Sequence, residues 1–157
     1  MELIELLAPE AVLPSLRVHS KKQLLNELSA RAAQLTGLPE RRIFETLTER
    51  ERLGSTGMGQ GIAIPHGRLA GLPHIVGIFA RLETPIAYDA IDDQLVDLVF
   101  LLLAPEDAGA DHLKALARVS RLLRNQAATE KLRAAKTAEA VYAILTDTTG
   151  ASGAQAA

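Results

Sequence analysis

The sequence contains no cysteine and no tryptophan, and aromatic residues make up only 3% of its 157 residues. The absence of cysteine excludes disulfides, thiolate metal sites, thiol nucleophiles and iron–sulfur ligation, and it favours a reducing compartment. So few aromatic rings leave little for bases to stack on, and a net charge of −2 gives no positive field to attract nucleic acid. We therefore expect a cytoplasmic protein that does not bind nucleic acid.

Long apolar segments are also missing. The longest uninterrupted apolar run, Leu98 to Ala104, is far shorter than the ~18 residues that a membrane-spanning helix needs. The first ten residues carry glutamates but no Lys or Arg, so they lack the basic start of a signal peptide. The sequence predicts a soluble chain without membrane insertion.

Helical signals are present towards both ends of the chain. Ser20 and Gly37 have the residue types of a helix cap and a helix stop, and they bound a stretch with helical apolar spacing. Pro39 and Gly54 bound a second such stretch. After Pro105 the helical period returns in three further segments. These patterns predict two helices, a central non-helical region and three more helices.

The central region has the composition of strands. Residues 75–80 and 95–104 are apolar runs of the kind found in strands covered on both faces, and residues 84–93 between them have the pattern of a turn. A shorter run, 62–64, follows a glycine-rich stretch and is expected to end at Pro65. Strands flanked by helices predict an α/β fold, in which a single domain over residues 1–148 holds a mixed β-sheet sandwiched between α-helices. Residues 149–157 are expected to form a disordered tail.

The densest candidate site is the stretch from Gly54 to Arg68. Its glycines allow a ligand to approach the backbone closely, and Pro65 keeps the preceding residue extended, so the next side chain, that of His66, leaves in a defined direction. A glycine-rich turn with a half-buried histidine is the simpler interpretation of this stretch alone. Two other residues favour a functional site.

Arg50 is the first of these residues. It lies on the same face of its predicted helix as Ile43 and Leu47, so its guanidinium is directed to the core side, and no acidic residue lies three or four positions away. A charge in that position needs an anionic partner. The partner is either a distant carboxylate or a phosphoryl group.

His112 is the second. It stands in the first turn of the helix that follows Pro105 and shares a face with Leu116 and Val119, so it also points inward, beside the positive end of the helix dipole. A core histidine bonded to a carbonyl is the alternative. We assign no role to His19 or His74.

An inward arginine, two histidines and a glycine-rich loop together suit a phosphorylated imidazole. Phosphoryl transfer depends on positioning and charge neutralisation, and the planar guanidinium matches two phosphoryl oxygens. A histidine-only metal site fits less well, since it needs a third ligand and Arg50 would repel the cation. The stretch also lacks the lysine of a nucleotide-binding P-loop and the nucleophile elbow of a serine triad. We expect His66 to be the nucleophile, with no metal and no cofactor.

The same stretch resembles the phosphorylation-site signature of the mannitol/fructose class of enzyme IIA domains in the bacterial phosphoenolpyruvate-dependent phosphotransferase system. The residues that carry the resemblance are Glu51, Met58, Gly59, Ile62, Ala63, Ile64, Pro65, His66 and Gly67. The wider pattern, which includes LETPIAYDAIDDQLVDLVFLLLAPED and DHLKALARVSRLL, is similar to the nitrogen-regulatory branch of that family.

The resemblance implies a site and partners. It implies that His66 accepts a phosphoryl group on Nε2 from a histidine phosphocarrier protein similar to HPr, and that Arg50 and His112 flank the phosphohistidine. It also implies a regulator of potassium transport, sensor kinases and nitrogen metabolism. Two alternatives stay open: a sugar-specific enzyme IIA that passes phosphate to a IIB domain of a mannitol/fructose-type permease, and a purely stoichiometric binding regulator.

Overall fold

The computed structural model describes residues 2–147, so the tail expected at residues 149–157 lies outside the described part of the chain. Two short 3-10 turns, Leu3–Glu5 and Pro9–Ala11, precede the regular elements. The strands are β1 (Val12–Leu16), β2 (Gly57–Gly59), β3 (Ile62–Ala63), β4 (His66–Leu69), β5 (Val76–Ile86) and β6 (Val96–Pro105). The helices are α1 (Lys21–Thr36), α2 (Glu40–Arg52), α3 (Ala110–Arg124), α4 (Gln126–Ala134) and α5 (Ala138–Leu145).

The strands form one mixed sheet in the order β1-β5-β6-β3-β2, with β4 also pairing with β6. The two long strands β5 and β6 are antiparallel, whereas β1, β3 and β4 run parallel to the strands they pair with. β3 and β4 follow each other along one side of β6, with His66 opposite Leu102. The first residue of β4 is therefore fixed by its pairing with β6, one of the two long strands.

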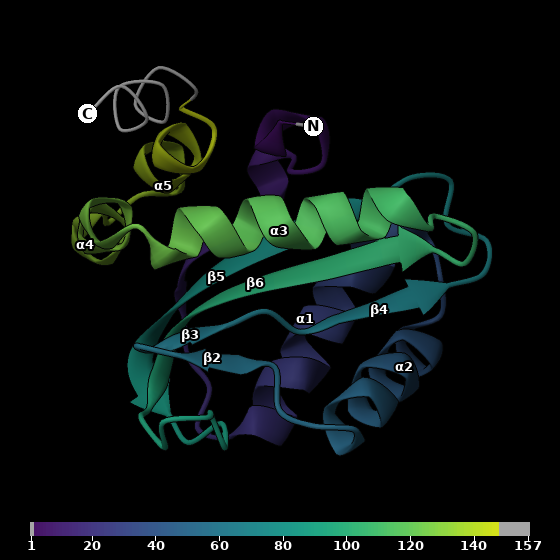
Figure 1. Ribbon diagram of the computed structural model, residues 1–157, viewed down its shortest axis with the longest axis horizontal. Coiled ribbons are helices and arrows are strands. Elements are labelled where there is room, and N and C mark those ends of the chain that lie inside the picture. The colour runs from purple at the N-terminus through teal and green to yellow at the C-terminus, as the bar shows by residue number, and fades with distance from the viewer. Residues whose placement is uncertain (1, 148–157) are drawn as a thin grey trace.

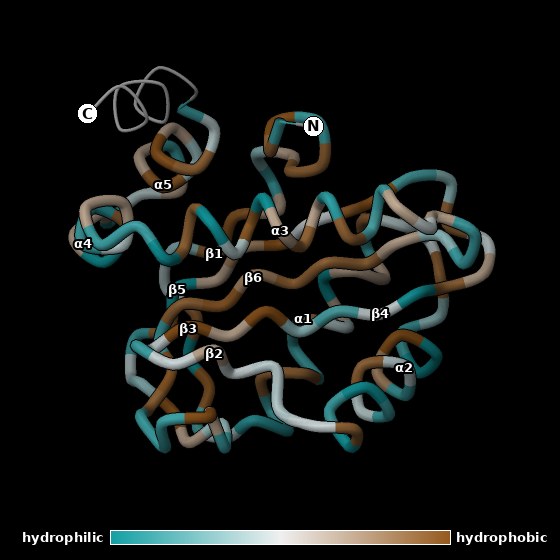
Figure 2. The backbone as a smooth tube through the Cα atoms, in the orientation of Figure 1, coloured by the Kyte–Doolittle hydropathy of each residue, from teal (hydrophilic) through white to brown (hydrophobic). Residues whose placement is uncertain are grey.

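Helices cover both faces of the sheet, as Figure 1 shows: α3 lies on one face, and α1 and α2 lie on the other. The hydrophobic residues concentrate along β5, β6 and β3 in Figure 2. Leu98 through Ala104 on β6 have no exposed surface, as expected for a strand covered on both sides. The predicted α/β fold, a mixed sheet sandwiched between helices, is confirmed. Within residues 2–147 no helix has both the length and the hydropathy to cross a bilayer.

The predicted ends of α1 agree with the structure, and one predicted end of α2 differs in detail. The Ser20 hydroxyl accepts a hydrogen bond from the Gln23 backbone N–H at 3.1 Å, and Gly37 ends α1 with a φ of +77°. Pro39 directly precedes α2 in extended conformation and is not part of its first turn. Both helices are defined by residues close in sequence, so the sequence alone was enough to predict them.

Four strands differ from the prediction. β1 was not predicted, the glycine-rich stretch expected to be loop contains β2, and the strand expected to end at Pro65 resumes as β4. β5 continues to Ile86, so the beginning of the turn expected at residues 84–93 is strand. Pro65 has no N–H to donate, but its pairing with β6 uses its carbonyl, which accepts a hydrogen bond from the Leu102 N–H at 3.0 Å. The pairing with β6 therefore continues past Pro65. His66 therefore lies at the start of a strand and not in a loop after one.

Candidate functional site

The three predicted site residues come from three elements that meet at one place. His66 is the first residue of β4, Arg50 lies in the last turn of α2, and His112 lies in the first turn of α3. The rings of His66 and His112 are edge-to-face with centroids 5.6 Å apart, and the Arg50 Nε lies 3.3 Å from the His66 Nε2. The structure brings together all three side chains that the sequence singled out.

Two contacts define the state of the His66 ring. Its Nδ1 lies 2.8 Å from the Ile64 carbonyl oxygen, which can only accept, so Nδ1 carries the proton. Its Nε2 faces the Arg50 Nε–H, which can only donate, so Nε2 keeps its lone pair. Both contacts require the same neutral tautomer. A half-buried neutral ring with its lone pair on Nε2 has the form that a nucleophilic histidine needs.

Arg50 is held in place from a second direction. Its Nη1 donates a hydrogen bond of 2.9 Å to the Gly54 carbonyl, just beyond the end of α2. Among the residues that the structure describes, no carboxylate forms an ion pair with Arg50. The distant carboxylate, one of the two partners considered for Arg50 from the sequence, is therefore not found there. The remaining N–H groups of its guanidinium are available to an anion at His66.

His112 is 5% exposed and has one hydrogen-bond partner in the described structure. That partner is Arg68, whose Nε lies 3.2 Å from the His112 Nδ1. The His112 Nε2 is buried and has no partner. The alternative of a core histidine bonded to a carbonyl is therefore not what is observed.

Burial lowers the pKa of both rings below the usual value of 6.5. At His66 the hydrogen bond to the Ile64 carbonyl acts against burial and raises the pKa, the charge of Arg50 lowers it and that of Glu51 raises it. At His112 the charges of His66 and Arg68 lower the pKa further. Both rings are therefore neutral at pH 7, which is the state in which His66 can attack an electrophile.

Comparison with protein families gives a match over residues 5–148 to the family described as phosphoenolpyruvate-dependent sugar phosphotransferase system, EIIA 2. The chain belongs to the EIIA 2 family. It is similar to the nitrogen regulatory protein of Bradyrhizobium diazoefficiens, with 60% identity over 92% of this chain and 95% of that protein. The nitrogen-regulatory branch that the sequence resembles is thus supported by a close relative.

Solved structures agree with this assignment. The nitrogen regulatory protein IIA-Ntr of Neisseria meningitidis has a TM-score of 0.87 and 41% identity, covering 92% of this chain and 99% of that one. The mannitol IIA of Escherichia coli has a TM-score of 0.74 over 88% of this chain and 97% of that one, and at 18% identity it shares the fold alone. The EIIA 2 fold is therefore the fold of this chain.

Glu51, part of the signature that carried the EIIA 2 resemblance, forms a buried network behind the site. Its carboxylate lies 2.9 Å from the Lys21 Nζ and accepts hydrogen bonds from the Thr56 N–H at 3.0 Å, from the Thr56 hydroxyl and from the Tyr88 hydroxyl at 3.3 Å. Burial, with the nearby Glu51 charge, raises the pKa of Tyr88 above its usual range, so this hydroxyl stays a donor. The network joins α1, the end of α2 and the glycine-rich stretch that leads to His66.

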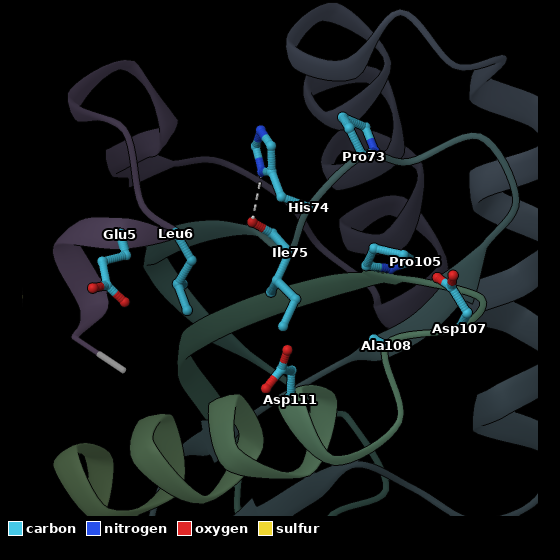
Figure 3. A pocket seen from close by; sticks show the side chains of 9 residues that line it. All are labelled: Glu5, Leu6, Pro73, His74, Ile75, Pro105, Asp107, Ala108 and Asp111. Atoms are coloured by element: carbon cyan, nitrogen blue, oxygen red, sulfur yellow. Dashed lines mark hydrogen bonds between the residues drawn. The ribbon is translucent and has the colours of Figure 1, made fainter.

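A separate hollow of about 370 Å³ lies elsewhere in this EIIA 2 domain, between the N-terminal turns and the start of α3 (Figure 3). It is lined in part by Glu5, His74, Asp107 and Asp111, and His74 Nδ1 is bonded to the Ile75 carbonyl at 3.1 Å. None of the three predicted site residues lines it. In residues 2–147 no group of three or more His, Cys, Asp or Glu side chains is arranged to hold a metal ion.

Arg68 was not among the site residues predicted from the sequence. A strand directs residues i and i+2 to the same face, so His66 and Arg68 project from the same side of β4. A strand that ends at Pro65, as the sequence predicted, would not place His66 and Arg68 on a common face. A strand pattern continued through 66–69 would have placed Arg68 beside the histidine.

Proposed function

We propose that this protein is a phosphocarrier and regulator of the nitrogen branch of the phosphotransferase system. In this proposal His66 accepts a phosphoryl group on Nε2 from an HPr-like histidine phosphocarrier. The phosphorylation state of His66 then sets how the protein binds its downstream partners, for which the family resemblance suggests potassium transport and sensor-kinase proteins.

The observation that carries the proposal is the pair of contacts that set the tautomer of His66. The hydrogen bond from Nδ1–H to the Ile64 carbonyl leaves the lone pair on Nε2, 3.3 Å from a guanidinium N–H. In the transfer the Nε2 lone pair attacks phosphorus, the N–P bond to the carrier's histidine breaks, and that histidine leaves as the carrier's neutral ring. Arg50 neutralises charge on the phosphoryl oxygens, and His112 lies on the neighbouring side of the ring.

The direct experiment is incubation of the protein with phosphoenolpyruvate, an enzyme I and a histidine phosphocarrier. We expect one acid-labile phosphate that tandem mass spectrometry locates on His66. His66→Ala should take up none and keep the wild-type melting temperature, because the ring is half-buried and not part of the core. His74→Ala is a matched control that removes an exposed histidine and should be phosphorylated like the wild type. Phosphate on His66→Ala would reject the assignment.

A sugar-specific role is a second candidate because the fold is shared with a mannitol IIA. The phosphorylated protein, freed of carrier, can be mixed with a IIB domain of a mannitol/fructose-type permease. We expect the phosphate to stay on His66 in the regulatory role, whereas rapid transfer to the IIB domain would favour the sugar role. Full partner binding by His66→Ala combined with an absence of phosphate uptake by the wild type would favour the purely stoichiometric regulator.

A further inference from the structure

Arg68 occupies a distinctive position beside the site. It follows His66 by two residues on β4, it is exposed, and its Nε lies 3.2 Å from the Nδ1 of the buried His112. Within residues 2–147 no ion pair joins Arg68 to a carboxylate. The side chain is thus directed at a ring nitrogen.

This contact determines which nitrogen of His112 carries the proton. An arginine Nε–H is always a donor, so the His112 Nδ1 must accept and cannot be protonated. The neutral ring then has its single proton on Nε2. That N–H is buried and has no acceptor, which is unfavourable for a buried donor and is uncommon in folded proteins.

The two neighbouring rings therefore hold opposite tautomers. In His66 the proton is on Nδ1, bonded to the Ile64 carbonyl, and Nε2 has the lone pair. In His112 the lone pair is on Nδ1, bonded to Arg68, and Nε2 has the proton. The ring centroids are 5.6 Å apart in an edge-to-face arrangement, so the two opposite tautomers lie side by side at the site.

We propose that Arg68 is a positioning residue that fixes His112 as an Nε2–H donor towards the phosphoryl group carried by His66. The inference rests on the proposed function, and it gives His112 a specific task there. Arg68 acts through the His112 ring, whereas Arg50 contacts the reacting nitrogen itself. An acceptor oxygen at His66 would supply the partner that the buried Nε2–H does not have.

The tautomer can be measured without any turnover. Long-range ¹H–¹⁵N NMR spectra at pH 8, where both rings are neutral, should show wild-type His112 as a single Nε2–H tautomer. In Arg68→Met the Nδ1 signal should move towards the position of a ring that exchanges between both tautomers, while Arg68→Lys, which keeps a donor, should stay close to wild type. Arg31→Met removes an exposed positive charge on α1 and should leave the spectrum unchanged. An unchanged His112 pattern in Arg68→Met would overturn the inference.

The effect on chemistry can be measured with phosphoramidate, which needs no protein partner. Its P–N bond breaks and ammonia leaves as the N–P bond to His66 forms. Arg68→Met should slow this reaction by about 10-fold, the lower end of the loss found when the outer hydrogen-bond partner of a metal-ligating histidine is removed. Arg68→Lys should restore most of the rate, and the Arg31→Met control should react like the wild type.

A double-mutant cycle separates action through His112 from direct action on phosphate. His112→Phe keeps a buried ring but removes the donor, and in that background Arg68→Met should have no further effect on the rate. Equal slowing in both backgrounds would show that Arg68 contacts the phosphoryl group directly and would overturn the positioning role. If wild-type His66 accepts no phosphate from phosphoramidate or the carrier, the proposed function fails, and the donor role of His112 fails with it. The NMR result then still decides whether Arg68 sets the tautomer.

Discussion

The two histidines at the site have the same side chain but hold their protons on different nitrogens because each Nδ1 has a different partner. A carbonyl oxygen at the His66 Nδ1 requires a proton there, and a guanidinium N–H at the His112 Nδ1 excludes one. Neither partner is itself a reacting group. The hydrogen bond at Nδ1 of each ring therefore determines whether the Nε2 of that ring carries a proton or a lone pair.

Arg50 gives the first residue-scale prediction. Arg50→Ala should slow phosphate uptake by roughly 10³-fold, because the guanidinium that faces the His66 Nε2 is lost. Arg50→Lys keeps the charge but not the planar fork, so its rate should lie between those of wild type and Arg50→Ala. Rates are measured by quenched-flow transfer from the phosphorylated carrier.

The control for this prediction is Arg52→Ala, which removes an exposed arginine from the end of the same helix. It should transfer at close to the wild-type rate. The Arg50 variants should also unfold at the wild-type denaturant midpoint. An Arg50→Ala protein that unfolds early but still phosphorylates His66 at full rate would show that Arg50 only supports the bend at Gly54.

At the scale of elements, the site depends on close packing of α2 against β4. Gly67 follows His66 directly, and a Cβ at Gly67 would lie 2.7 Å from the Thr46 Cγ2 on α2. Helix and strand therefore approach so closely that only the hydrogen atom of a glycine fits at this position, where every other residue would place a Cβ carbon. This approach keeps Arg50 on α2 within reach of His66 on β4.

Gly67→Ala should accordingly lower the free energy of unfolding by about 1–3 kcal/mol, the usual cost of an added methyl in a tightly packed place. Thr46→Ser removes the Cγ2 but keeps the hydroxyl that donates to the Arg42 carbonyl, so the double variant should regain much of that loss. Urea denaturation of the wild type, both single variants and the double variant measures the coupling. Strictly additive effects would contradict this account of the packing.

The sequence predicts those elements whose boundaries are set locally and misses those set by distant pairing. Ser20 and Gly37 bound α1 through contacts within a few residues. Pro14 interrupts the apolar pattern of β1, which is tolerated because β1 lies at the sheet edge, and its partner β5 is far away in the sequence. Only the completed sheet identifies β1 as a strand.

The same distinction applies to the site. Arg50 and His112 could be found because helical spacing fixes the face on which a side chain lies. Arg68 could not be found, because its orientation depends on the resumption of strand pairing after Pro65, with β6 as the partner. The arrangement of the rings, 5.6 Å apart and edge-to-face, depends on the tertiary fold and has no local signal.

At the scale of the whole molecule, burial of the two rings makes stability depend on pH. The unfolded chain binds protons at these rings below about pH 6.5, whereas the folded protein, with both pKa values lowered, binds them only at lower pH. The free energy of unfolding is therefore not reduced by these rings above about pH 7, where they are neutral in both states. It falls as the pH decreases from about 7 towards the folded-state pKa values, because protons then bind to the unfolded chain first.

Thermal unfolding should show this dependence. The melting temperature should fall between pH 7.5 and pH 5.5, and the double variant His66→Gln, His112→Gln should show a smaller fall over the same interval. His19→Gln controls for removal of an exposed imidazole that lies before α1. Parallel pH profiles for wild type and double variant would show that groups other than these rings cause the loss.

His66 is attached to a strand whose ladder with β6 extends from His66 to Leu69. A residue on such a ladder has little freedom to shift its backbone when it gains a phosphate. In the proposed cycle, the two forms of the protein therefore differ mainly in electrostatic potential at one spot on an otherwise unchanged surface. A partner with cationic side chains opposite that spot would select the phosphorylated form, and a partner with carboxylates there would select the unmodified form.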